Sequence, residues 1–163
     1  MYRVGIITAS DKGSQGKRED VSGATIKEII EKENYKVTEY VVVPDEKEDI
    51  KNAIIDMIDN KFVDLVLTTG GTGFSKRDVT PEATKEVIDK ETPGISEGIR
   101  NFSFKITPKA MLSRATSGIR NNSLIINMPG SPKAVRESLE YLLQALTHGM
   151  DILKGNDSEC AED

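Results

Sequence analysis

The sequence predicts an α/β fold, a three-layer α/β/α sandwich built on a mostly parallel, mixed central sheet. Apolar runs typical of strands alternate along the chain with segments whose apolar residues recur every three or four positions, as in amphipathic helices. Two further apolar runs, 116–120 and 123–128, flank the turn residues Asn121 and Asn122. That arrangement is typical of an antiparallel hairpin, so part of the sheet is predicted to be antiparallel.

Three strands and two helices are predicted in the first half of the chain. The strands cover residues 4–7, 37–43 and 63–67, where Val, Ile and Leu dominate. Ser22 is predicted to begin the first helix, because serine is a common N-cap before an apolar-periodic segment. The second helix has the apolar spacing of a helix that lies on a sheet: Ile50, Ile54, Met57 and Ile58.

Helices and the hairpin are predicted in the second half. Thr80 is predicted as the N-cap of a helix with Pro81 at its first position. Residues 95–104 and 110–114 are predicted to be helical, with proline breaks around them. The last helix is predicted to begin after Ser131 as N-cap, again with proline at the first position, and its apolar stripe is Val135, Leu139, Leu142, Leu143 and Leu146.

Length and composition predict one domain over residues 1–154, followed by an acidic, disordered tail over residues 155–163. The chain has 163 residues, of which 37% are hydrophobic and 30% charged, a balance that suits one buried core. A single cysteine, Cys160, excludes an intrachain disulfide and a cysteine-based metal site. The lone His148 follows an apolar helical stripe, where packing or solvation is the favoured interpretation.

Charge and hydropathy exclude two classes of partner. The net charge of −5 argues against nonspecific nucleic-acid binding, which needs Lys and Arg gathered on one face. The sequence contains no apolar run long enough for a membrane span, and its first ten residues lack the pattern of a signal peptide. We therefore expect a cytoplasmic protein that binds neither nucleic acid nor membrane.

The stretch TTGGTGFSKRDVTPEA, residues 68–83, predicts an anion pocket. Glycines allow positive φ and bring backbone N–H groups close to a ligand, and the helix that follows presents the positive end of its dipole. Phosphate is the ligand that such a loop favours. The stretch lacks both the dinucleotide-binding and the P-loop patterns of glycines, so neither motif explains it. The alternative interpretation is that the glycines only close a tight strand-to-helix connection.

Four loops are predicted to meet at one edge of the sheet, because ligands in open α/β sheets bind beyond the carboxyl ends of parallel strands. These loops cover residues 10–22, 43–48, 68–80 and 128–133. The last of them, with Pro129, Gly130 and Ser131, is a second candidate anion site or an ordinary strand-to-helix connection.

Asp45 and Asp78 are the candidate metal ligands. Each has a structural alternative: Asp45 could cap the helix that begins near Glu46, and Asp78 could brace its loop through backbone N–H groups. A carboxylate beside a phosphate-binding loop would repel the ligand unless a cation lies between them. Mg²⁺ satisfies this requirement, because it uses one or two carboxylates together with substrate phosphate oxygens.

At five places the sequence resembles the MogA/MoaB family of molybdenum cofactor biosynthesis proteins, which includes molybdopterin adenylyltransferase. The resemblance runs from about Tyr2 to Leu153. Its motifs are TTGGTG at 68–73, RDVTPEA at 77–83, PDE at 44–46, LSR at 112–114 and NMPGSP at 127–132.

This resemblance implies a nucleotidyltransferase, usually a trimer, that uses ATP and Mg²⁺ to adenylylate molybdopterin and releases pyrophosphate. Asp45 and Asp78 match the family's functional pair and would be both catalytic residues and metal ligands. The phosphate contacts would come from Gly70, Gly71, Thr72 and Gly73, and the pterin end would be held by Ser113 and Arg114.

Three basic residues, Lys76, Arg77 and Lys133, are equal candidates to neutralise the departing pyrophosphate. A molybdate insertase would be the partner that receives the product. The first rival hypothesis is a carrier or scaffold of the same fold that binds molybdopterin without turnover. The second rival, an insertase itself, is disfavoured because 163 residues leave no room for additional domains.

Overall fold

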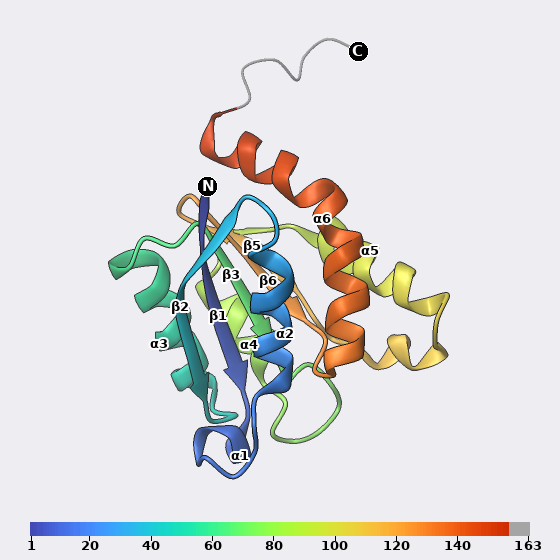
Figure 1. Cartoon of the computed structure of the whole chain (residues 1–163). Helices are drawn as coiled ribbons and strands as arrows, with labels where there is room; N and C mark the ends of the chain where they lie inside the picture. Colours follow the sequence, from blue (N-terminus) through green and yellow to red (C-terminus); the bar gives the residue numbers. More distant parts are fainter. Residues whose placement is uncertain (157–163) are drawn as a thin grey trace.

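The computed structural model describes residues 1–156 and contains a six-stranded sheet with helices on both faces (Figure 1). The strand order is β2-β1-β3-β6-β5-β4. Strands β2, β1, β3 and β6 are parallel, whereas β5 pairs antiparallel with both β6 and β4, so the predicted mixed sheet is confirmed. The strands are β1 (Tyr2–Ala9), β2 (Tyr35–Val43), β3 (Leu65–Thr69), β4 (Lys90–Glu91), β5 (Ser117–Arg120) and β6 (Ser123–Met128).

The helices form the two outer layers of the sandwich. Helices α2, α5 and α6 share one core with the sheet, and α3 and α4 share the other. The elements are α1 (Asp11–Ser14), α2 (Val21–Ile30), α3 (Lys47–Ile55), the π-helical turn η1 (Asp56–Asn60), α4 (Thr80–Val87), α5 (Pro93–Phe104), the 3₁₀ helix η2 (Pro108–Leu112) and α6 (Pro132–Lys154). The predicted three-layer α/β/α fold is therefore confirmed.

Alternating side chains of the central strands supply both cores. In β1, Ile6 packs into the core with Ile26 of α2, whereas its neighbour Ile7 packs into the other core with Ile50 of α3. All four side chains are fully buried. This period of two across a strand explains why the central strands read as continuous apolar runs instead of alternating ones.

Two predicted helix starts were wrong by one or two residues: a different side chain caps α2, and the N-cap of α4 is Val79, without a side-chain capping bond. Asp20, not Ser22, is the N-cap of α2, and its carboxylate accepts a hydrogen bond from the Gly23 amide at 2.9 Å. Thr80 is the first residue of α4 and not its N-cap; its hydroxyl donates to the Gly70 carbonyl at 2.9 Å. The predicted cap at Ser131 is confirmed by its bond from the Ala134 amide.

The less regular region between α4 and β5 also differs from the prediction. Helix α5 begins at Pro93, two residues earlier than predicted, and the predicted turn over 110–114 is the 3₁₀ helix η2.

β2 begins at Tyr35, where the buried ring packs near that of Tyr2 with centroids 5.7 Å apart. Of the predicted acidic tail, residues 157–163 lie outside the described residues.

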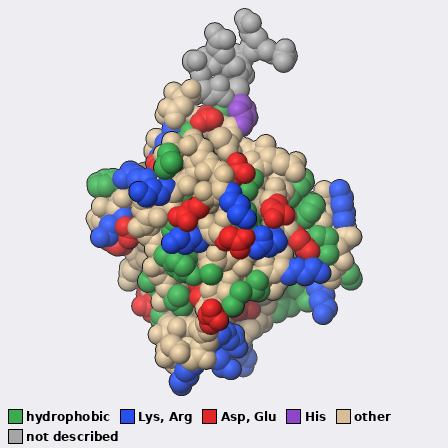
Figure 2. Space-filling view, in the orientation of Figure 1, with side chains coloured by type: hydrophobic (Ala, Val, Ile, Leu, Met, Phe, Trp, Pro, Cys, Tyr) green, Lys and Arg blue, Asp and Glu red, His purple; other side chains and the backbone are tan. Residues whose placement is uncertain are grey.

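The surface carries charges of both signs. On the described part of the face in Figure 2, Lys and Arg side chains are interspersed with Asp and Glu and form no single basic area. Within residues 1–156, no helix is both long and apolar enough to cross a membrane.

Strand order places a crevice between β1 and β3. From β1 the chain adds β2 on one side and β3 and β6 on the other, so the order reverses between β1 and β3. The four parallel strands end at Ala9, Val43, Thr69 and Met128 on one edge of the sheet. Such a switch point separates the loops that follow the two strands and opens a ligand crevice there.

Candidate active site

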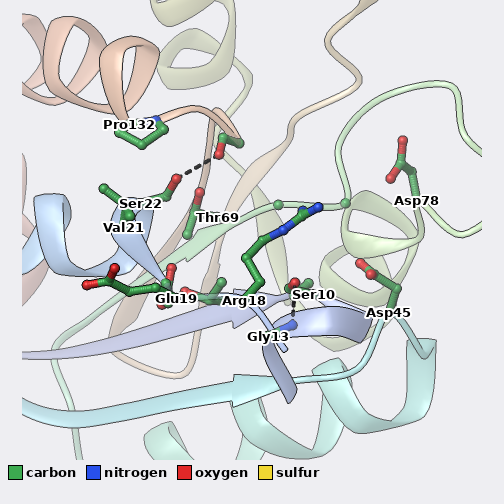
Figure 3. A pocket seen from close by; sticks show the side chains of 16 residues that line it. Ser10, Gly13, Arg18, Glu19, Val21, Ser22, Asp45, Thr69, Asp78 and Pro132 are labelled. Atoms are coloured by element: carbon green, nitrogen blue, oxygen red, sulfur yellow. Dashed lines mark hydrogen bonds between the residues drawn. The ribbon is translucent and has the colours of Figure 1, made fainter. Parts of the chain in front are cut away.

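A pocket of about 510 Å³ lies at this switch point (Figure 3). Each of the four predicted loops contributes to its lining. The contributions are residues 8–10, 13 and 18–22, Asp45, residues 69–71 with Asp78, and Gly130 with Pro132. The prediction that these loops meet at one edge is confirmed.

The glycine loop between β3 and α4 adopts a backbone that only glycine accommodates well. Gly70 and Gly71 have φ of 86° and 69°, in the left-handed region. A Cβ on Gly70 would lie 2.3 Å from the carbonyl oxygen of Ala9, so the ends of β1 and β3 approach too closely for a side chain. Thr80 fastens the loop to α4, since its amide donates to the Gly71 carbonyl at 3.1 Å.

Three helices begin at or beside the pocket. Val21 and Ser22 of α2 and Pro132 of α6 line it, and α4 begins behind Gly71. Ser22 donates its hydroxyl to the Gly130 carbonyl at 2.7 Å, which ties the start of α2 to the loop before α6. Helix N-termini carry partial positive charge and free amides, so their convergence favours an anionic ligand.

Asp45 points into the pocket and does not cap α3 (Figure 3). Within the described residues the N-cap of α3 is Glu46, without a side-chain capping bond. Asp45 instead exchanges bonds with Asp11: its Oδ2 accepts from the Asp11 amide at 2.9 Å, and its own amide donates to Asp11 Oδ1 at 3.0 Å. Its Oδ1 faces Gly71, where a Cβ would lie 3.4 Å away. The capping alternative for Asp45 is therefore wrong.

Asp78 lines the same pocket from the far end of the glycine loop. Its Oδ2 accepts from the Ser75 amide at 3.0 Å, so the predicted bracing of the loop is confirmed. Bracing occupies one oxygen and leaves Oδ1 available for a ligand. The two interpretations of Asp78, brace and ligand, are thus compatible.

Arg77 holds three loops together. Its Nε and Nη2 donate to the two carboxylate oxygens of Asp11 at 3.0 and 2.9 Å, and its Nη1 lies 2.7 Å from Glu46 Oε1. The hydrogen bonds from the Arg77 guanidinium lower the pKa of Asp11, and the bonds to Asp11 and Glu46 raise the pKa of Arg77. Burial raises the pKa of Asp45, and the neighbouring charges of Asp11 and Asp78 raise it further. The carboxylates of Asp45 and Asp78, two negative charges, therefore lie in the same pocket beside the glycine loop.

This pair fits a divalent cation. Burial and a second carboxylate both disfavour the ionised form of Asp45, and a bound cation would relieve both effects. No cluster of three or more His, Cys, Asp and Glu side chains suited to a metal occurs within residues 1–156. Asp45 and Asp78 would supply two ligands, and the remaining ligands would be phosphate oxygens and water, as Mg²⁺ prefers.

Arg114 braces the glycine loop from outside the pocket. Its Nε donates to the Gly73 carbonyl at 2.7 Å, its Nη2 donates to the Asp78 carbonyl at 2.8 Å, and its Nη1 pairs with Glu82. Ser113 and Arg114 line a neighbouring cavity of about 300 Å³ that Lys85 also lines. The structure therefore separates these two residues from the glycine-loop pocket.

The other predicted substrate-binding residues lie in or next to the pocket. Gly70, Gly71 and Gly130 line it, and Thr72 and Gly73 continue the loop. Pro129 accepts a hydrogen bond from the Thr69 hydroxyl at 2.6 Å through its carbonyl, and Ser131 caps α6.

Two residues in or near the pocket were not predicted from the sequence as part of the site. Arg18 points into the pocket from the loop before α2 (Figure 3), and its only sequence signal is its place after a parallel strand. Asn127 is fully buried, and its amide donates to the hydroxyls of Thr68 and Thr84, both at 2.9 Å. It links β6 to β3 and to α4, next to the glycine loop. A polar residue at the end of an otherwise apolar strand was the available signal.

The fold and the pocket define a class: α/β proteins with a glycine-lined crevice at the switch point of a mostly parallel sheet. A family model described as a probable molybdopterin binding domain matches residues 5–148. The chain belongs to this family.

Known relatives match nearly the whole chain. A molybdopterin adenylyltransferase of Helicobacter pylori strain J99 is 46% identical over 155 residues, which cover 94% of this chain and 88% of the relative. The Escherichia coli K12 protein of the same name is 38% identical over 154 residues, 91% of this chain and 79% of its own. The crystal structure of the molybdopterin biosynthesis enzyme MoaB from Thermus thermophilus superposes with a TM-score of 0.90 at 46% identity, covering 95% and 98% of the two chains.

Proposed function

We propose that this protein adenylylates molybdopterin with ATP and releases pyrophosphate. The observation that carries the proposal is the pair Asp45 and Asp78 beside the positive-φ glycines at the switch point. Amides and helix N-termini there suit phosphate groups, and the two carboxylates suit the cation that such groups bring. The adenylyltransferase name of relatives at 46% and 38% identity supports the same reaction.

The reaction needs positioning and charge neutralisation more than a covalent nucleophile. A terminal phosphate oxygen of molybdopterin attacks the α-phosphorus of ATP and forms a new P–O–P bond. The bond from the α-phosphorus to the bridging oxygen breaks, and pyrophosphate leaves with the electron pair. The amides of Gly70 to Gly73 stabilise charge on the transferring group, because they are fixed before the ligand arrives.

Asp45 and Asp78 would hold Mg²⁺ through the oxygens that face the pocket. When bound, this ion supplies charge neutralisation between the two anionic substrates. The Asp11 amide donates a hydrogen bond to the Oδ2 atom of Asp45, and the Ser75 amide donates one to the Oδ2 atom of Asp78. Each carboxylate is therefore aimed before a metal arrives.

The cavity beside Arg114 supports the assignment of the pterin end. It adjoins the glycine loop through the contacts of Arg114 with Gly73 and Asp78, and it contains the side chains of Ser113 and Lys85. A ligand that spanned both cavities would have its terminal phosphate near the glycine loop. Further parts of the proposal are one domain over residues 1–154, a cytoplasmic homotrimer, and transfer of the product to a molybdate insertase.

Turnover separates this function from a carrier that binds molybdopterin without reaction. The purified protein is incubated with molybdopterin, ATP and Mg²⁺, and pyrophosphate release is followed. Binding of the pterin without release of pyrophosphate would favour the carrier instead.

The Asp78→Asn variant tests the role of the carboxylates. We expect loss of turnover with retention of pterin binding, because the substitution removes a metal ligand and leaves the pocket in place. The control is Asp49→Asn, which makes the same charge change at an exposed position of α3 outside the pocket lining. Full activity of the D78N protein would reject the metal assignment.

A further inference from the structure

The side chains that line the pocket carry more negative than positive charge. Its lining contains four carboxylates, those of Glu19, Asp20, Asp45 and Asp78. Among the described residues that line it, Arg18 is the one cationic side chain. These four carboxylates would repel a ligand with several phosphate groups. The guanidinium of Arg18 would offset part of that repulsion.

The basic residues singled out from the sequence are occupied elsewhere or lie outside the lining. Arg77 is bound to Asp11 and Glu46. Lys133, with a side chain 81% exposed, lies 3.9 Å from Glu137 on α6. Neither Lys76 nor Lys133 belongs to the described lining of the pocket. None of these three is placed like Arg18.

Arg18 is held by none of the residues that surround it. Within residues 1–156 its guanidinium has no hydrogen bond or ion pair, in contrast to Arg77 with its three bonds to carboxylates. Its backbone lies between Gly16, with φ of 71°, and Asp20, which is anchored as the N-cap of α2. Figure 3 shows the side chain extending from this loop across the pocket.

Guanidinium chemistry points to the ligand group. Arginine presents its N–H donors in a planar fork that matches two oxygens of a phosphate, and it keeps its charge in any protein environment. The guanidinium of Arg18, without a protein partner among the described residues, can therefore donate hydrogen bonds to a phosphate group in the pocket.

We propose that Arg18 binds the pyrophosphate portion of the nucleotide and stabilises it as it leaves. The inference deepens the proposed function and rests on it for the identity of the nucleotide. It replaces Lys76, Arg77 and Lys133 as the residue that neutralises the leaving group. When the α-phosphorus bond breaks, negative charge accumulates on pyrophosphate, and the fork of Arg18 donates to its oxygens.

Inorganic pyrophosphate is the direct probe. Its affinity is measured by isothermal titration calorimetry for the wild type and for the Arg18→Ala, Arg18→Lys and Lys17→Ala variants. We expect R18A to weaken binding roughly 10- to 100-fold, the effect of losing charge-assisted hydrogen bonds. R18K restores part of the affinity, because it returns the charge without the fork.

K17A is the matched control. Lys17 is the neighbouring residue in the same exposed loop and lies outside the described lining, and its removal changes the net charge equally. We expect K17A to change the affinity less than about threefold, the scale of a screened surface charge. Equal thermal midpoints for R18A and wild type check that the fold is intact.

Pyrophosphate binding and turnover separate the two hypotheses. If wild type and R18A bind pyrophosphate equally, or neither binds it, the inference is overturned whatever the turnover. If wild type shows no turnover but R18A still loses pyrophosphate affinity, the adenylyl-transfer proposal fails and the anion site at Arg18 stands. Turnover by wild type with a lower kcat in R18A supports both.

Discussion

Gly70→Ala is the substitution that best tests how the pocket edge is built. Gly70 sits where the ends of β1 and β3 converge, with φ of 86° and the Ala9 carbonyl oxygen 2.3 Å from the place of a Cβ. The added methyl therefore meets backbone, which cannot rotate away as a side chain can. Either β1 or the glycine loop must move.

The expected loss of stability has two parts. A non-glycine residue in the left-handed region costs about 1–2 kcal/mol. Forcing a methyl into a packed site costs about 1–3 kcal/mol more. We therefore expect Gly70→Ala to lower the free energy of unfolding by about 2–5 kcal/mol and to weaken phosphate binding, because the displaced loop carries the amides.

Gly16→Ala measures the conformational cost separately from the steric cost. Gly16 has a similar φ of 71°, but the structure places no described atom within 4 Å of its Cβ position. We expect it to cost only the conformational share, about 1–2 kcal/mol. Urea unfolding of the wild type and both variants gives the comparison. If Gly70→Ala were no more destabilising than Gly16→Ala, the close approach of β1 and β3 would not constrain the loop.

The remaining predictions concern Asp45 and Asn127. Burial raises the pKa of Asp45 above its unfolded value, so its ionised form destabilises the metal-free fold at neutral pH. Asp45→Asn should therefore raise the thermal midpoint at pH 7 while abolishing turnover. The difference in midpoint between D45N and wild type should disappear as the pH falls through the raised pKa toward the ordinary carboxyl value of about 3.9. A lower midpoint for D45N than for wild type at pH 7 would contradict this. Asn127→Ala removes three hydrogen bonds, including the one from the Thr116 amide, and should cost about 2–4 kcal/mol in urea unfolding, against less than about 0.5 kcal/mol for the exposed Asn52→Ala. Equal costs for these two variants would refute the role of Asn127.

Local patterns predicted most of the fold. The alternation of strand and helix, the hairpin around Asn121 and the cap at Ser131 depend on neighbours in sequence, and each was predicted correctly. Strand parallelism then placed the four loops at one edge. The wrong start of α2 shows the limit of this reasoning, because Asp20 and Ser22 are both good caps and only the fold decides between them.

Contacts between distant residues were not predictable. Arg77 was a candidate phosphate ligand on its sequence position, but it pairs with Asp11, 66 positions earlier in the chain. Arg114 likewise donates hydrogen bonds to two carbonyls of the glycine loop, those of Gly73 and Asp78. A basic residue beside a glycine turn has the same local sequence whether its side chain binds a ligand or a carboxylate of the protein. The local sequence alone therefore cannot identify its partner.

The three-way junction of Asp11, Asp45 and Arg77 makes the rim of the pocket stiff in the unliganded protein. A flexible rim would lose conformational entropy when a ligand binds, whereas this rim has lost most of that entropy when the chain folds. We therefore expect a ligand to bind with little rearrangement of the backbone that carries Asp11, Asp45 and Arg77.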